Sequence, residues 1–234
     1  MVTKTAEGMT TTQEEVVVQA PEIEVSEDIQ AKAQVFIDAY RKRLLKATEA
    51  YSHRQEAEIE AGEPQLAAGY QYWNCLTVGP IQFSGNPPYR PSKIIAAGEV
   101  SLMLGIIWIN PVNGPGGSLP GTIVLGGRPF RARFEGVDLT NVANGPDMTF
   151  AGVLASPAPV VTTLTYWMPT PDPGINPRLY EMNFTADVTL PGQPFAAFST
   201  WHFDPDLEPG FLGLGPAGPH WQFERPARFL IYRK

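Results

Sequence analysis

Cysteine, histidine and long apolar runs are scarce in this chain of 234 residues. With the single cysteine Cys75 an internal disulfide is impossible, so nothing requires an oxidising compartment. The three histidines leave few candidate bases for a Ser-His-Asp or Cys-His site. The longest apolar run, Ile94 to Ile109, is interrupted by Glu99 and is shorter than the ~18 residues of a membrane helix. No apolar stretch of the signal-peptide kind occurs near the N-terminus. We therefore expect a soluble, cytoplasmic protein.

Positive charge is also scarce, since the formal net charge is −7. Most of the excess negative charge lies in residues 1–28, which hold seven acidic residues and one lysine. Nucleic-acid binding depends on the neutralisation of phosphates by Lys and Arg. The charge balance therefore argues against a nucleic-acid partner.

Proline and glycine are almost absent from residues 1–61, which hold one of each, whereas the rest of the chain holds 23 prolines and 21 glycines. Such a composition would suggest low complexity. The hydrophobic share of 43% and the five tryptophans argue against that, because disordered chains have little apolar surface to bury. The sequence therefore predicts two differently built regions that join near Gly62–Pro64.

The N-terminal region is expected to contain a tail and one helix. Residues 1–26 lack a helical period and are predicted to be an acidic, disordered tail. Ser26 can cap a helix whose first turn contains Glu27 and Asp28, where the helix dipole favours negative charge. The spacing predicts an amphipathic helix over residues 27–61. An all-β domain is expected over residues 64–234.

Apolar residues in the predicted helix follow a heptad spacing. They are Ala33, Ile37, Tyr40, Leu44, Ala47 and Tyr51. Such a seam is typical of a coiled coil, which would form a homo-oligomer through Ile37, Tyr40, Leu44 and Tyr51. The same stripe is also what a helix needs in order to pack on its own domain. The sequence leaves both alternatives open.

The region after Pro64 shows the period of β-strands. Apolar and polar residues alternate over Phe130–Glu135 and Tyr180–Leu190, and Val100–Ile109 is apolar on both faces, as in a central strand. Gly105 within it suggests a bend or bulge. Further strands are expected at Tyr70–Val78, Thr122–Leu125, Met148–Leu154, Val160–Met168, Phe195–Phe203 and Arg228–Arg233. The predicted fold is mainly β: an antiparallel β-sandwich or barrel of about eight or nine strands, preceded by one long N-terminal helix.

A metal site is one candidate for chemistry. His202 and Asp204 share a strand face, and a His-x-Asp pair with a distant second histidine, here His220, is typical of non-haem iron oxygenases. The short Pro/Gly-rich segment between the two histidines argues against this, since several strands must pass between such ligands. The simpler interpretation is a strand end that runs into an acidic surface loop.

Two further groups are candidates for ligand binding. Arg131 and Arg133 project from one face of a strand and could hold a carboxylate or phosphate, or could pair with Glu135 or a neighbouring strand. Trp108, Trp167 and Trp201 could line an apolar pocket, or could form part of the core. These alternatives also remain open.

The sequence favours a non-catalytic structural or protein-interaction protein, with no cofactor, in which the helix mediates self-assembly. One alternative is a β-barrel that binds a small apolar ligand. A second alternative is a metal-dependent oxygenase that uses His202, Asp204 and His220.

Overall fold

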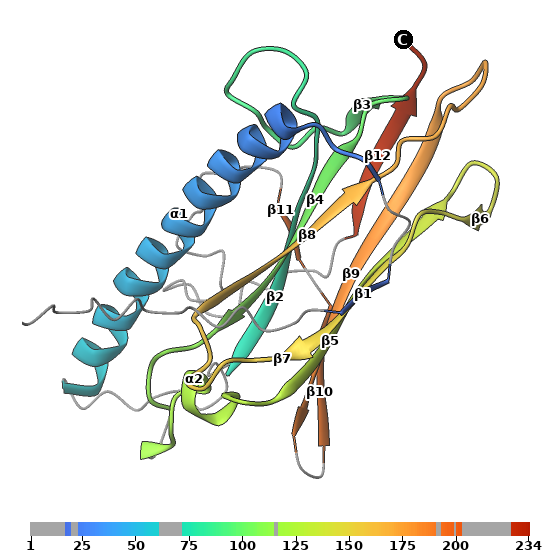
Figure 1. Cartoon of the computed structure of the whole chain (residues 1–234). Coiled ribbons are helices and arrows are strands. Elements are labelled where there is room, and N and C mark those ends of the chain that lie inside the picture. Colours follow the sequence, from blue (N-terminus) through green and yellow to red (C-terminus); the bar gives the residue numbers. More distant parts are fainter. Residues whose placement is uncertain are drawn as a thin grey trace, which may run out of the picture.

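The computed structural model describes residues 17–19, 23–60, 72–114, 117–190, 193–198, 200–202 and 226–234, with side chains at 23–53, 72–114, 117–189 and 226–234. These residues form two helices and twelve strands (Figure 1). The elements are β1 Val17–Gln19, α1 Glu27–Glu60, β2 Trp73–Ile81, β3 Ile94–Ala96, β4 Ser101–Ile109, α2 Gly121–Val124, β5 Pro129–Asp138, β6 Ala143–Asn144, β7 Met148–Val153, β8 Val161–Met168, β9 Arg178–Leu190, β10 Gln193–Phe198, β11 Thr200–His202 and β12 Ala227–Tyr232.

The strands form two sheets that do not close into a barrel. The large sheet has the order β1-β7-β5-β9-β12-β3, with β10 added to β9 and β6 added to β5. The small sheet has the order β11-β2-β4-β8. Most neighbours are antiparallel, as expected, but β12 pairs with β3 and β11 pairs with β2 in parallel. The fold is therefore a mainly β sandwich with a long N-terminal helix.

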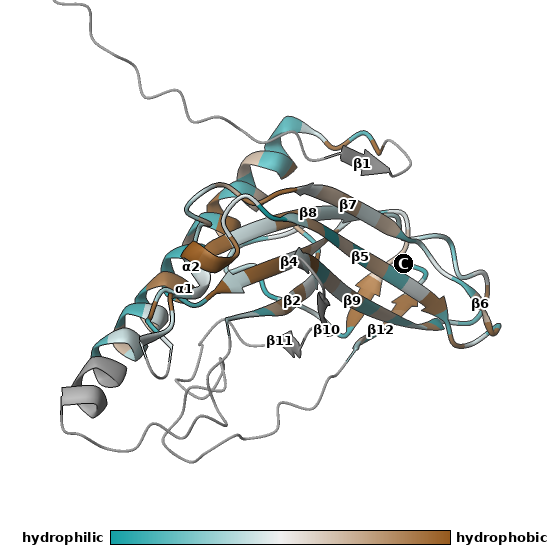
Figure 2. Cartoon of the chain, turned by 90° about the horizontal axis from the view of Figure 1, so that it is seen from below, coloured by the Kyte–Doolittle hydropathy of each residue, from teal (hydrophilic) through white to brown (hydrophobic). Residues whose placement is uncertain are grey.

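The two sheets pack face to face around an apolar core. The alternation predicted for residues 180–190 is present in β9, whose even-numbered residues from Tyr180 to Val188 are buried. Figure 2 shows the same alternation of apolar and polar residues along β5 and β9. Phe134, Phe184 and Tyr166 fill the space between the sheets, with the Phe134 and Phe184 ring centroids 4.6 Å apart. The described inner faces of the sandwich are thus filled with side chains.

Helix α1 forms a third layer on the other side of the small sheet (Figure 1). It begins at Glu27, as predicted, and the Ile29 N–H lies 3.4 Å from the Ser26 hydroxyl. Five of the six seam residues are buried, and these five belong to one cluster with side chains of β2, β4 and β8. The chain's own sheet therefore covers the helical stripe, which is the second of the two alternatives. None of the described helices is long and apolar enough to cross a membrane.

Strand β4 explains the two-sided apolar pattern of its sequence. All nine of its residues are buried, because the large sheet covers one face and α1 covers the other. The bulge suggested at Gly105 is absent, since its pairing with Thr77 and Leu164 is in register. The register shift in this sheet lies instead between Val78 and Ile81. Gly105 makes room for a ring, since a Cβ there would lie 2.5 Å from the Cζ of Phe184.

The predicted strand at Thr122–Leu125 is wrong, because Gly121–Val124 forms the short helix α2. The Val124 N–H donates to the Pro120 carbonyl, and the Leu125 N–H donates to that of Gly121. Two local backbone hydrogen bonds thus override the β propensity of the sequence.

Other differences concern short or divided strands. The expected strand Phe195–Phe203 is divided into β10, which joins the large sheet, and β11, which joins the small sheet. Strands β3 and β6 were not predicted, since two or three residues cannot show an alternation. Strand β1 lies within the segment predicted as a disordered tail, and its backbone pairs with β7.

Candidate functional site

Two of the three candidate tryptophans lie in the layer between α1 and the small sheet. Trp108 is fully buried, and its indole N–H donates to the Thr48 hydroxyl at 2.9 Å. Trp167 packs against the same cluster, with its ring centroid 6.2 Å from that of Phe83. The helix fills this layer with its own side chains. Trp201 lies on β11, where its backbone is opposite Thr77, and its side chain is outside the described residues.

The candidate metal ligands fall largely outside the described residues. The backbone of His202 lies on β11, opposite Val78 of β2. Asp204 and His220 belong to residues 203–225, which the structure does not describe. The metal site therefore stays a prediction from the sequence.

The two candidate arginines form exposed ion pairs on the outer face of the large sheet. The Nε of Arg131 lies 3.0 Å from the carboxylate of Asp187 on the neighbouring strand β9. Arg133 pairs with Glu135, at 3.0 Å, on its own strand β5. All four side chains are at least partly exposed. Each guanidinium is thus matched by a carboxylate, and exposed pairs of this kind contribute little to stability.

A hollow of about 360 Å³ lies at the open end of the sandwich, where the β5–β6 turn meets the β8–β9 loop. Its wall combines three prolines with one ion pair, between the buried Asp138 and the partly exposed Arg178, and several polar side chains. The lining residues are Asp138, Asn141, Ala143, Asn144, Gly145, Pro146, Pro169, Pro171, Arg178 and Tyr180. It brings together residues from β5, β6, β9 and the three connecting segments β5–β6, β6–β7 and β8–β9.

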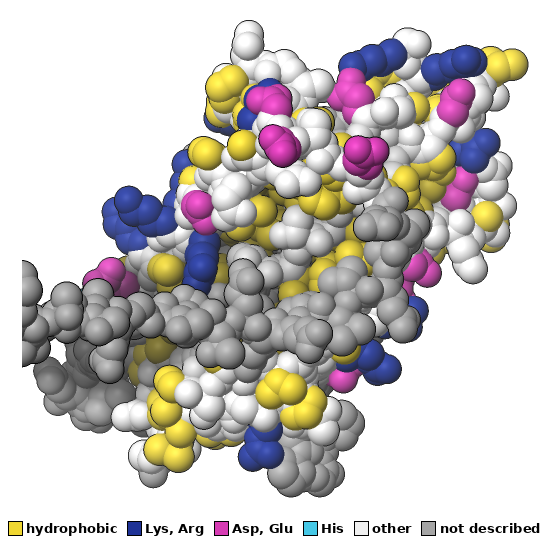
Figure 3. Space-filling view, viewed as in Figure 1, with side chains coloured by type: hydrophobic (Ala, Val, Ile, Leu, Met, Phe, Trp, Pro, Cys, Tyr) yellow, Lys and Arg dark blue, Asp and Glu magenta, His cyan; other side chains and the backbone are white. Residues whose placement is uncertain are grey.

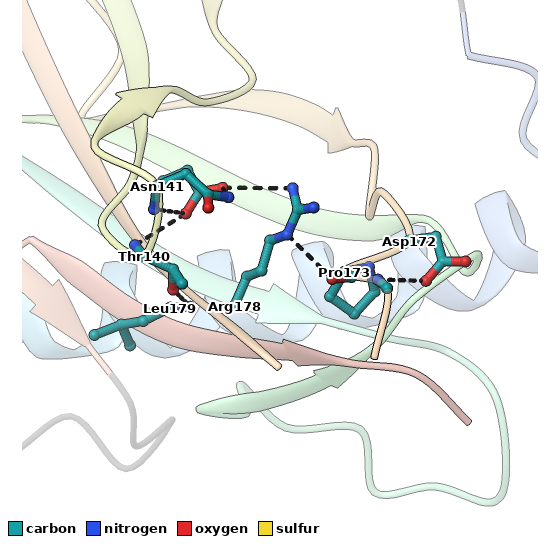
Figure 4. A network of polar contacts seen from close by, with 8 residues as sticks. Thr140, Asn141, Asp172, Pro173, Arg178 and Leu179 are labelled. Carbon is teal, nitrogen blue, oxygen red and sulfur yellow. Dashed lines mark hydrogen bonds and ion pairs between the residues drawn. The ribbon is translucent and has the colours of Figure 1, made fainter. Parts of the chain in front are cut away.

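Asp138 is the centre of the polar network in this hollow, and its partners Thr140, Asn141 and Arg178 are labelled in Figure 4. It is only 4% exposed, and it lies at the last position of β5. One carboxylate oxygen accepts the backbone N–H groups of Thr140 and Asn141 at 3.0 and 3.1 Å. The other accepts the Asn141 side-chain amide at 2.8 Å and lies 3.6 Å from Nη1 of Arg178. The carboxylate therefore holds the turn after β5 in place and fixes it to β9.

Arg178 is held from two sides at the start of β9. Its Nε donates to the Pro173 carbonyl at 3.2 Å, and its guanidinium faces Asp138 on the other side (Figure 4). The turn and β9 are joined a second time, because the Leu179 N–H donates to the Thr140 hydroxyl at 2.8 Å. The Arg178 side chain remains about one third exposed. Its guanidinium is thus positioned by the protein and is still reachable from solvent.

Two titratable groups in the wall of the hollow, Asp138 and Tyr180, have shifted pKa values. Burial alone would raise the pKa of Asp138, but the hydrogen bonds from Asn141 and Thr140 and the charge of Arg178 outweigh it and hold the pKa below its usual value. Burial, together with the charge of Asp138, raises the pKa of the Tyr180 phenol. Near neutral pH the carboxylate is charged and the phenol is protonated, so neither is suited to proton transfer there.

Two exposed aliphatic side chains lie in the turn and the loop that contribute to the hollow. Val142, 89% exposed, lies between the lining residues Asn141 and Ala143, and Ile175, 96% exposed, lies in the β8–β9 loop. Figure 3 shows hydrophobic side chains at this end of the molecule. Val142 also has a φ of 53°, in the left-handed region that valine rarely adopts. Val142, in the turn between β5 and β6, is therefore exposed to solvent.

Sequence reasoning did not single out this site. A signal is present at its centre, since Asp-Leu-Thr-Asn at residues 138–141 follows an alternating strand, and Asp and Asn favour turns in which their side chains bind nearby backbone. Nothing in the sequence places Arg178, 40 residues further on, beside that turn.

Comparison with known proteins adds no function to this geometry. No protein-family description matches the chain, and no curated protein matches its sequence.

Proposed function

We propose that this is a non-catalytic protein-interaction protein that presents the open end of its sandwich to a protein partner. The observation that carries the proposal is the prearranged guanidinium of Arg178 in the wall of the hollow, together with the exposed Val142 and Ile175 in the β5–β6 turn and the β8–β9 loop, which both contribute to that wall. Arginine is enriched at protein–protein interfaces, where a positioned guanidinium can anchor a partner.

The chemistry of the hollow defines the kind of partner. Pro146, Pro169 and Pro171 give a mostly apolar wall that suits an aliphatic or aromatic side chain. Arg178 can donate hydrogen bonds to a carboxylate or carbonyl oxygen of the partner. A non-catalytic role agrees with Asp138, whose oxygens are already engaged by hydrogen bonds and an ion pair. We therefore expect a partner segment with an apolar anchor beside an acceptor oxygen.

Helix α1 has a structural part in this proposal. Its stripe, including Ile37, Tyr40, Leu44 and Tyr51, packs on the small sheet. Self-association through these four residues would require the helix to leave the sheet. The role that we propose for α1 is to cover the small sheet and stiffen the domain.

Site-specific photo-cross-linking tests the proposal. A photoreactive phenylalanine derivative is placed at Ile175 and, as the control, at Leu119, which is 58% exposed in the loop before α2. The partner captured only from position 175 is then purified and titrated against three variants of the full chain. Ile175→Ser and Arg178→Ala should each weaken binding by about tenfold or more, as at interface hot spots, whereas Leu119→Ser should not. Identical capture from both positions, or equal affinities for all variants, would contradict the proposal.

A further inference from the structure

One strand edge of the small sheet is long, regular and unpaired. Among the described strands, β8 ends the small sheet with eight residues, Val161–Met168, whereas β1, β3 and β11 at the other sheet ends have three residues each and β10, which pairs only with β9, has six. No described strand pairs with the side of β8 that faces away from β4. A long edge strand presents a row of backbone donors and acceptors on which another strand can pair.

The register determines which backbone groups lie on that side. The Ile109 N–H donates to the Val160 carbonyl at 2.8 Å, so that pair is hydrogen-bonded. Hydrogen-bonded and non-hydrogen-bonded pairs alternate along an antiparallel ladder. The even-numbered residues of β8 therefore bond to β4 across the continuous register. The outward groups belong to Thr163, Thr165 and Trp167, which are half-buried, and to Val161, which is buried.

The features that usually protect an edge strand are missing from β8. Its sequence, Val-Thr-Thr-Leu-Thr-Tyr-Trp-Met, contains no charged residue and no proline, and its pairing with β4 contains no bulge. The edge strand β3 is different. The side-chain amide of Gln82 accepts a hydrogen bond from the Ala96 N–H at 2.8 Å and donates one to the Ala96 carbonyl at 2.7 Å, as a neighbouring strand would. The edge of β3 is thus capped, whereas no described strand caps the outer side of β8.

We propose that β8 pairs with β8 of a second copy of this chain, antiparallel and centred on Leu164, so that two small sheets join into one. In this register, which bonds the outward groups to one another, Thr163 faces Thr165 of the second copy and Val161 faces Trp167 of the second copy. Thr–Thr and aromatic–β-branched pairs are both favourable across antiparallel strands. The pairing is self-complementary about a two-fold axis, so it closes after two copies.

Strand β8 of a second copy suits the edge of β8 better than an unrelated peptide does. An uncharged edge offers little that would select a foreign strand, while its own sequence supplies matched pairs at every outward position. The pairing is independent of the interaction site proposed above, which is built from β5, β6, β9 and the three segments that connect β5 to β6, β6 to β7 and β8 to β9. A dimer through β8 can therefore exist whether or not that site binds a partner.

Sedimentation velocity of the full chain over a range of concentrations tests the proposal. The wild type should be a dimer, and Thr163→Lys/Thr165→Lys, which brings like charges together across the pair, should weaken the dimer at least tenfold. Thr185→Lys is the matched control, since Thr185 is a similarly half-buried threonine on the outer face of the large sheet, and it should leave the dimer unchanged. A wild-type monomer at all concentrations, or equal dimerisation of all three proteins, would overturn the proposal.

A second measurement does not depend on disruption of the strand. Cysteines at Thr163 and Thr165 face each other across the proposed pair, within the Cα separation that a disulfide allows. Mild oxidation of Thr163→Cys/Thr165→Cys should give a covalent dimer, and the same treatment of the wild type, whose Cys75 is buried, should not. A variant that dimerises without the cross-link would show that β8 is not the interface.

Discussion

Trp108 on β4 donates its indole N–H to the hydroxyl of Thr48 on α1, at 2.9 Å and with both side chains buried. The Thr48 hydroxyl in turn donates to the Leu44 carbonyl one turn earlier in the helix, also at 2.9 Å. The Tyr51 ring lies edge-on to the Trp108 ring, with the centroids 6.4 Å apart. This contact fixes the position of the helix along the small sheet, because it is directional in a layer that is otherwise held by apolar packing.

Removal of the Thr48 hydroxyl should therefore destabilise the protein. Thr48→Val keeps the shape but leaves the buried indole N–H without an acceptor, which costs about 1–3 kcal/mol. Thr48→Ser keeps the hydroxyl and serves as the control. Urea unfolding should show a larger loss for Thr48→Val than for Thr48→Ser. An equal loss would mean that the hydroxyl contributes no more to stability than the methyl group that Thr48→Ser removes.

Two adjacent leucines test whether α1 is an integral part of the domain. Leu44 is fully buried against the small sheet, whereas Leu45 is 40% exposed. Leu44→Ala should lower the free energy of unfolding by about 2–5 kcal/mol, as expected for a core leucine. Leu45→Ala should change it by no more than about 0.5 kcal/mol. Thermal unfolding of both variants measures the difference, and a small effect at both positions would show that the helix contributes little.

Gly105 should tolerate no side chain while Phe184 is in place. A Cβ at residue 105 would lie 2.5 Å from the Phe184 ring, which is buried and held by Phe134. Gly105→Ala should therefore cost about 1–3 kcal/mol by overpacking. In the double variant Gly105→Ala/Phe184→Leu the smaller side chain makes room, so the two costs should not add. Additive losses in a double-mutant cycle would show that the ring is not what excludes the methyl group.

Long strands and the long helix could be predicted from the sequence because their side chains repeat with a fixed period. The alternation along residues 180–190 and the two-sided apolar run of β4 both correspond to strands with the expected burial. Short elements carry no such period, and α2 replaces an expected strand through two local hydrogen bonds. Whether the helical stripe meets its own domain or another copy depends on tertiary packing, and an amphipathic period is the same in both cases.

The candidate site could not be predicted from the sequence for a different reason. Asp138 and Arg178 lie 40 residues apart and meet because β5 and β9 are neighbours in the large sheet. The sequence drew attention to Arg131 and Arg133, which are close together in the chain but face exposed carboxylates. Sequence proximity is a poor guide where strand order brings distant residues together.

The network around Asp138 makes a prediction about pH. The folded-state pKa of Asp138 lies below its unfolded value because hydrogen bonds from Asn141 and Thr140 and the charge of Arg178 outweigh the effect of burial. The stability that this carboxylate contributes is thus present above the unfolded-state pKa, near 3.9, and is lost as the pH falls through the lower folded-state value. The free energy of unfolding should fall in that acidic window.

Asp138→Asn isolates this contribution. At pH 7 the variant should be less stable than the wild type by about 1–3 kcal/mol, because a neutral amide replaces a hydrogen-bonded carboxylate beside Arg178. The difference should shrink as the pH falls through the lowered folded-state pKa of Asp138, below which the wild-type carboxyl is itself protonated. Asp187→Asn is the control, since it removes a carboxylate from an exposed pair with Arg131 and should cost at most about 1 kcal/mol. Urea unfolding at pH 7, 4 and 2.5 measures both series. A difference between wild type and Asp138→Asn that stays constant over this range would show that the shape of the side chain, and not its charge, holds the turn to β9.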